Sequence, residues 1–137
     1  MRDTATGMSQ EHLARVQEAL QSFVTTGEPP WDALHPEIVV RDHDIMDGSD
    51  YRGHEGFGRW LQDWSAAWSE ESIEPEEFLD AGERVLVFIR QRTTGQGSGV
   101  ALERQDAMLF GFRDGKIASL DYYNSREQGR RAAGLQG

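Results

Sequence analysis

The chain has 137 residues and carries 24 acidic against 14 basic side chains, a formal net charge of -10. This length fits one domain of roughly 100–150 residues, and the negative charge excludes nucleic acid and membrane surfaces as expected partners, since phosphate backbones and anionic lipid repel it. Cysteine is absent, which excludes disulfides and thiolate metal sites, and the lack of a membrane-length apolar run or a signal peptide predicts a cytoplasmic protein.

The first predicted element is a helix. Residues 1–8 are polar and are expected to form a disordered tail, and residues 9–137 are expected to form a single domain. Ser9 is a good N-cap residue. The apolar residues after it keep the spacing of one helix face as far as Gly27, where the helix is expected to end.

A strand and a second helix follow. The apolar run Ile38–Val40 predicts a strand that leads into a short polar segment. After a loop over 44–53, large apolar side chains recur every three or four residues, which predicts a strongly amphipathic helix over 55–69. Its aromatic stripe must pack on another element.

The second half of the chain predicts four consecutive strands and a short last helix. Asp114-Gly115 is a strong signal for a tight hairpin, and the motif over 125–128 matches a capping box. The glycine-rich run 95–99 looks like a phosphate loop, but it joins two strands and opens no helix, so a flexible hairpin is the preferred interpretation. The strands are Ile73–Ala81, Arg84–Thr94, Val100–Arg113 and Lys116–Tyr123. Together these elements predict an α+β fold, with a curved antiparallel sheet that packs against helices and encloses a pocket of small-molecule size.

Three motifs carry a resemblance to a known fold: Tyr51–Gly56, Phe112–Ile117 and Asp121–Glu127. With the order of the elements, they resemble the nuclear transport factor 2-like superfamily, particularly its SnoaL-like branch. The resemblance implies a cone-shaped half-barrel with a central cavity, usually packed as a homodimer through the outer sheet face. It does not imply a reaction, because this fold hosts isomerases, cyclases, dehydratases, epoxide hydrolases and plain binding proteins.

Alternation along the predicted strand Val100–Arg113 predicts which side chains face the cavity. Arg104, Asp106 and Met108 share a face with the bulky Phe110, and we take that face as the inner one. Arg104 and Asp106 are therefore expected to point into the cavity.

The strand ends also resemble the limonene epoxide hydrolase family, where an arginine between two aspartates activates water and protonates the epoxide. Arg90 matches the arginine and Asp121 matches the aspartate of the last strand. Arg92 stands in place of the second aspartate, so epoxide hydrolysis does not carry over directly, and Asp106 is the candidate substitute. Tyr123, two residues after Asp121, is a candidate hydrogen-bond donor to an oxyanion.

These residues suggest an acid/base pair. Asp121 beside an arginine would stay ionised and polarise water as a weak base, and Asp106 in a drier setting would be the acid. The alternative is that the charged side chains only satisfy one another in a structural ion network. Trp60 and Trp64 either line the cavity or simply pack in the core. The expected substrate-binding residues are Asp42, His43, Trp60, Trp64, Arg92, Arg104, Met108 and Phe110.

Two functions are compatible with this pattern. The first is a cofactor-independent acid/base enzyme for a small, partly apolar metabolite, acting by epoxide opening, cyclisation or isomerisation, with natural-product biosynthesis as the expected setting. The second is a non-catalytic binding or accessory protein of the same fold. No metal is expected, because the four histidines show no ligand spacing. An isolated polar cluster in an apolar pocket would favour the enzyme, and complete salt-bridge satisfaction of that cluster would favour the binding protein.

Overall fold

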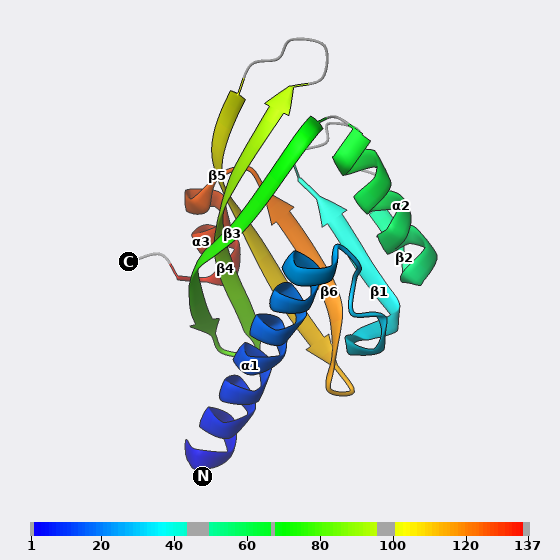
Figure 1. The fold of residues 1–137 in the computed structure, drawn as a ribbon. Coiled ribbons are helices and arrows are strands. Elements are labelled where there is room, and N and C mark those ends of the chain that lie inside the picture. The colour runs from blue at the N-terminus through cyan, green and yellow to red at the C-terminus, as the bar shows by residue number, and fades with distance from the viewer. Residues whose placement is uncertain (1, 44–49, 67, 96–100, 136–137) are drawn as a thin grey trace.

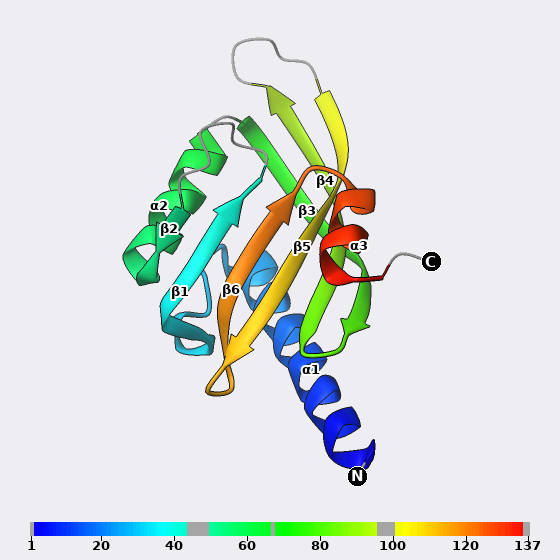
Figure 2. The same ribbon diagram turned by 180° about the vertical axis from the view of Figure 1, so that it is seen from behind.

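A twisted, open sheet of six strands forms the centre of the molecule, in the order β2-β1-β6-β5-β4-β3. The computed structural model describes residues 2–43, 50–66, 68–95 and 101–135. Helices α1 and α2 cover one face of the sheet, and α3 lies on the other (Figures 1 and 2). We call these the inner and the outer face. The helices are α1 (Arg2–Thr26), the short 3₁₀ helix η1 (Trp31–Ala33), α2 (Gly53–Ala66) and α3 (Arg126–Ala133).

All neighbouring strands run antiparallel, apart from β1 and β6, which run parallel. The sheet is therefore mixed, which corrects the antiparallel expectation at this one pair. In the chain, α2 and four further strands separate β1 from β6, so the two parallel strands are not joined by a hairpin. The strands are β1 (Leu34–Asp42), β2 (Asp50–Arg52), β3 (Trp68–Ala81), β4 (Arg84–Gly95), β5 (Ala101–Arg113) and β6 (Lys116–Tyr123).

Helix ends differ from the prediction at two places. Helix α1 begins at Arg2, so residues 2–8 are helical where a disordered tail was expected, and Ser9 lies inside the helix. No proline interrupts this segment, and a helix can extend from its packed part. Helix α2 ends at Ala66, and Trp68 already belongs to β3. The aromatic spacing runs on past the helix, so periodicity alone does not mark the end.

Both faces of the central strands are buried. The inner cluster joins Val85, Val87 and Ile89 of β4 to α1 and α2, and the outer cluster joins Leu86 and Phe88 to α3. In a strand buried on both sides, the sequence does not show which set of alternate residues faces the cavity. No helix in the described part of the chain is long and apolar enough to cross a membrane.

The predicted turn at Asp114-Gly115 and the predicted cap at Ser125 are confirmed. Asp114 and Gly115 both have positive φ, 55° and 76°, and form the tight β5–β6 turn. Ser125 Oγ accepts a hydrogen bond from the Gln128 N–H at 3.3 Å and caps α3. Gly134 ends that helix in the left-handed conformation, with φ of 75°.

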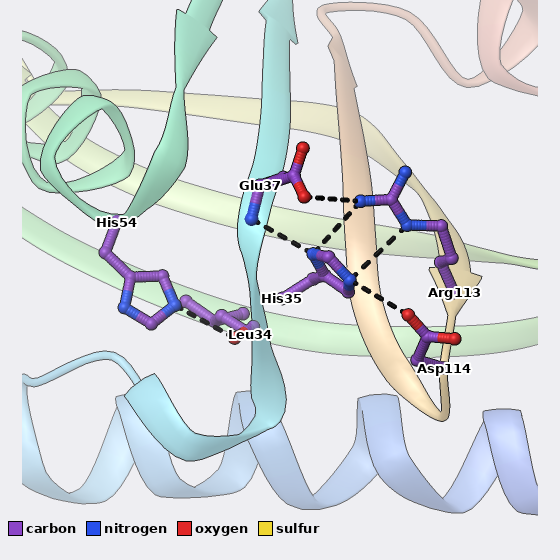
Figure 3. A network of polar contacts seen from close by, with 6 residues as sticks. All are labelled: Leu34, His35, Glu37, His54, Arg113 and Asp114. Carbon is purple, nitrogen blue, oxygen red and sulfur yellow. Dashed lines mark hydrogen bonds and ion pairs between the residues drawn. The ribbon is translucent and has the colours of Figure 1, made fainter.

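A polar network around His35 ties the start of β1 to the β5–β6 hairpin (Figure 3). The backbone N–H of Glu37 donates to His35 Nδ1 at 3.0 Å, and His35 Nε2 lies 3.3 Å from Asp114 Oδ2. The Arg113 guanidinium lies 3.3 Å from both ring nitrogens. His35 is 7% exposed, so the centre of this network is buried between β1 and the hairpin.

Candidate functional site

An apolar cavity of about 70 Å³ lies between the inner face and the helices α1 and α2. This volume is well below the roughly 300–1,000 Å³ of common ligand pockets, so the enclosed space is smaller than the predicted pocket. Met108 and Phe110 line it, as alternation along β5 predicted, and so does Trp60. The lining residues are Ala19, Leu20, Phe23, Pro29, Pro30, Leu34, Phe57, Trp60, Leu61, Ile89, Met108, Phe110, Ile117, Leu120 and Tyr122.

The first carboxyl group at this cavity is that of Asp42, the last residue of β1. Ile38 and Val40 precede it on the inner face, and Asp42 itself is 7% exposed. Trp60 Nε1 donates a hydrogen bond of 2.7 Å to Asp42 Oδ2. The expected binding residue Asp42 is therefore held by an aromatic side chain that forms part of the cavity wall.

The second carboxyl group is that of Asp106 on β5, which is completely buried. Asp106 shares the inner face with Met108, and its register partner on β4 is Ile89, which lines the cavity. The Tyr122 hydroxyl donates a hydrogen bond to Asp106 Oδ2, while the Tyr122 ring lines the cavity. The predicted inward orientation of Asp106 is confirmed.

Asp42 and Asp106 flank Tyr122 across three neighbouring strands. Asp42 is the register partner of Tyr122 in the parallel pair, and β5 lies on the other side of β6. The rings of Trp60 and Tyr122 are 5.9 Å apart between centroids. Asp42 and Asp106, which we call the inner carboxyl pair, do not line the cavity but lie directly behind its wall, where they are hydrogen-bonded to the lining residues Trp60 and Tyr122.

Asp121 lies on the outer face, away from the cavity. The Arg41 guanidinium donates to both oxygens of Asp121, at 2.7 and 3.1 Å, and His43 Nε2 lies 2.8 Å from Oδ1. The His43 ring stacks on the Tyr123 ring at 4.5 Å. We call these four residues, Arg41, His43, Asp121 and Tyr123, the outer cluster.

Electrostatics of the outer cluster favour an ionised Asp121. Burial by itself raises the pKa of Asp121. The hydrogen bonds from Arg41 and His43 and the charges of these two residues lower it by a larger amount, so the pKa of Asp121 lies below its ordinary value. Burial, followed by the negative charge of Asp121, raises the pKa of the Tyr123 hydroxyl. The arginine beside Asp121 is Arg41 and not the expected Arg90.

The predicted trio of Arg90, Asp121 and Asp106 is not brought together. Arg90 lies on the outer face with Leu86 and Phe88, where it pairs with Glu76 at 2.9 Å. Asp121 also lies on the outer face, but on β6 beside β1, and Asp106 lies on the inner face. The epoxide hydrolase arrangement is therefore wrong for this chain. The reason is the parity of β4 and β6, which the sequence leaves open because both faces are buried.

Other predicted binding residues divide between the two faces. Arg92 lies on the outer face within 3.9 Å of Glu74 and 3.7 Å of Glu103, so it does not reach the cavity. His43 belongs to the outer cluster and does not line the cavity either. The side chains of Trp64 and Arg104 lie outside the described residues.

Tyr122 is the site residue that sequence reasoning missed. The polar residues selected from the sequence, Asp121 and Tyr123, lie on the opposite face of β6, and Tyr122 is not among them. The usable signal is Leu120-x-Tyr122, because one apolar and one aromatic residue two apart mark the face that meets the core.

Comparisons with known proteins agree with this fold. The SnoaL-like domain model matches residues 31–120, and no curated protein matches the chain. A nuclear transport factor 2-like protein of unknown function from Burkholderia pseudomallei is 19% identical, with a TM-score of 0.70 over 88% of this chain and 95% of that one. A protein proposed to be a SnoaL-like polyketide cyclase, from a Jannaschia species, is 16% identical, with a TM-score of 0.68 over 90% and 94%.

A third structure extends the range of proteins with this fold. It is a protein from Catenulispora acidiphila with a ketosteroid isomerase-like fold, in complex with trimethylamine. It is 17% identical to this chain, with a TM-score of 0.65 over 87% of this chain and 94% of that one. The TM-scores establish a common fold, and identities this low show nothing beyond the fold. Because the family model covers residues 31–120 of 137, the chain belongs to the SnoaL-like domain family.

Proposed function

We propose that the protein is a cofactor-independent enzyme that carries out acid/base chemistry on a small, partly apolar molecule. One observation carries the proposal: the inner carboxyl pair lies directly behind the wall of an apolar cavity, and each carboxyl is hydrogen-bonded to an aromatic side chain of that wall. Charges act strongly in such a water-poor site, and groups fixed in place stabilise developing charge without reorganising.

The two carboxyl groups have different partners, which suggests different roles. The Trp60 N–H can only donate, so its bond orients the Asp42 carboxyl as an acceptor, and we assign Asp42 as the general base. The Tyr122 hydroxyl can both donate and accept. Since it links Asp106 to the cavity wall, we assign the Asp106–Tyr122 pair as the acid: a protonated Asp106 would donate to the Tyr122 oxygen, which frees the Tyr122 proton for a developing oxyanion.

A base and an acid on opposite sides of the substrate are suited to cyclisation, double-bond isomerisation and epoxide opening. In each reaction, a base on one side of the substrate removes a proton or activates a water, and a donor on the other side stabilises an oxygen of the substrate. The fold shared with the proposed polyketide cyclase and with the ketosteroid isomerase-like protein supports the first two. Cyclisation or isomerisation is therefore our first choice.

A non-catalytic binding protein is the second candidate. It is favoured by the same contacts, because Trp60 and Tyr122 already satisfy the carboxyl oxygens that they contact. In that case the inner carboxyl pair would only orient a bound ligand.

Product analysis by mass spectrometry tests the proposal. The protein is incubated with epoxides, unsaturated ketones and linear polyketones in isotope-labelled water, in parallel with Asp42→Asn, Asp106→Asn and Asp121→Asn. General acid/base groups contribute about 10²–10⁴-fold in rate, so we expect losses of that order for Asp42→Asn and Asp106→Asn only. A labelled diol means hydrolysis, and an isomer of the substrate means cyclisation or isomerisation.

The three variants also separate the alternatives. All three carboxyls are buried, so each substitution can disturb folding. Circular dichroism therefore checks that each variant is folded. Loss of turnover in Asp121→Asn alone would place the chemistry on the outer face. Binding without turnover, by the wild type and the variants, would support the binding protein.

A further inference from the structure

The enclosed cavity holds only part of a ligand of ordinary metabolite size. Its volume is about 70 Å³, less than half of the ~150 Å³ cavity that accommodates benzene in an engineered protein. Its lining side chains are apolar apart from the Trp60 and Tyr122 polar groups, which point to the inner carboxyl pair. A larger substrate therefore places only its reacting end here.

A surface groove adjoins the cavity at Leu20. The groove lies between α1 and β3, has a volume of about 420 Å³ and is lined by Gln17, Leu20, Gln21, Val24, Pro75 and Phe78. Leu20 lines both spaces and is 8% exposed, so it forms the wall between them. Val24, by contrast, is 51% exposed, one of the two exposed large hydrophobic side chains among the described residues.

The sheet places this groove close to the inner carboxyl pair. Pro75, Ile89 and Asp106 are successive register partners across β3, β4 and β5. Neighbouring strands are about 4.8 Å apart, so Pro75 lies roughly 10 Å from Asp106. Ile89 between them lines the cavity. The distance from the cavity to the groove is therefore short, and the Leu20 side chain is the wall that an extended ligand would have to displace.

We propose that the ligand is an elongated, uncharged, mostly hydrocarbon molecule whose polar end lies against Trp60 and Tyr122, next to Asp42 and Asp106, and whose apolar part passes Leu20 into the α1–β3 groove. The inference rests on the proposed function for the polar end only. Of the groove residues, none is charged, and two glutamines accompany four apolar side chains. The net charge of -10 disfavours an anionic chain.

Binding of straight-chain primary alcohols from butanol to decanol, followed by isothermal titration calorimetry, tests this. Burial of one CH₂ contributes ~0.8 kcal/mol, about fourfold in affinity, so we expect a fourfold gain per methylene that continues beyond hexanol. Asp106→Asn should change the affinity of all the alcohols by the same factor. Affinity that stops rising at hexanol would overturn the proposal.

A matched pair of variants tests the groove itself. Val24→Asp places a charge in the groove, and Thr25→Asp places the same charge on the next, exposed residue of α1, which does not line the groove. We expect Val24→Asp to weaken decanol at least tenfold and to leave butanol unchanged, and Thr25→Asp to change neither. Equal effects of the two variants would contradict the inference.

These titrations need no turnover, so they test the groove independently of the proposed function. Length-dependent binding by a protein that turns nothing over would retain the groove and reject the enzyme. Turnover of compact substrates together with length-independent binding would retain the enzyme and reject the groove.

Discussion

The Tyr122 hydroxyl donates a hydrogen bond to the Asp106 carboxyl from the neighbouring strand, on the inner face of the sheet. Asp106 is fully buried and Tyr122 is 2% exposed. A buried carboxyl costs free energy unless it is hydrogen-bonded, so this pair contributes to folding as well as to the proposed chemistry.

Tyr122→Phe should therefore lower both stability and turnover. Removal of one partner from a buried polar pair costs about 1–3 kcal/mol, which urea unfolding measures directly. Tyr123→Phe is the matched control for stability, since no hydrogen bond of the Tyr123 hydroxyl is found among the described residues, and we expect a change below about 0.5 kcal/mol. Equal destabilisation by the two variants would show that the Asp106 bond contributes nothing.

Acid should weaken the fold through Asp121. Its pKa is lowered in the folded state, so the unfolded chain takes up the proton first as the pH falls. The stabilisation is present above the ordinary aspartate pKa of about 3.9 and is lost as the pH falls through the lower folded pKa. Urea unfolding between about pH 7 and pH 3 should show a smaller acid-induced loss in Asp121→Asn than in the wild type. Asp32→Asn, an exposed carboxyl in η1, should keep the wild-type slope, and a shared slope in all three proteins would refute the role of Asp121.

Close approach of α3 to the sheet predicts a third effect. A Cβ atom at Gly129 would lie 2.6 Å from Ala107 Cβ and 3.2 Å from Leu86 Cδ1. Overpacking of this kind costs about 1–3 kcal/mol, so Gly129→Ala should lower the midpoint of thermal unfolding although alanine favours helix. Gln128→Ala, on the exposed side of the same helix, should change it little. A higher midpoint for Gly129→Ala would mean that α3 moves outward without cost.

Local signals predicted the fold well, and the site only in part. The hairpin at Asp114 and the cap at Ser125 are fixed by residues next to each other in sequence, so the sequence is sufficient for them. The parity of β5 was readable because bulky Phe110 marks its inner face.

The face of β6 depends on contacts far apart in sequence. Asp121 faces Arg41, 80 residues earlier, while Tyr122 faces Asp106. Two adjacent polar residues of β6 thus serve opposite faces. Alternation says that they differ, Leu120 indicates that Tyr122 is the inner one, and the contacts with the partner strands establish it.

Filling the cavity should exchange function for stability. Ala19 lines the cavity from α1 and is 8% exposed, and Ala19→Leu places a larger apolar side chain in the space of about 70 Å³. Cavity-filling substitutions commonly add about 0.5–2 kcal/mol, so we expect a higher urea midpoint together with loss of butanol binding and of turnover. Ala14→Leu makes the same change on the exposed side of the same helix and should alter neither binding nor turnover. If Ala19→Leu binds butanol as the wild type does, the ligand does not occupy this cavity, and both the enzyme and the binding protein proposed here lose their site.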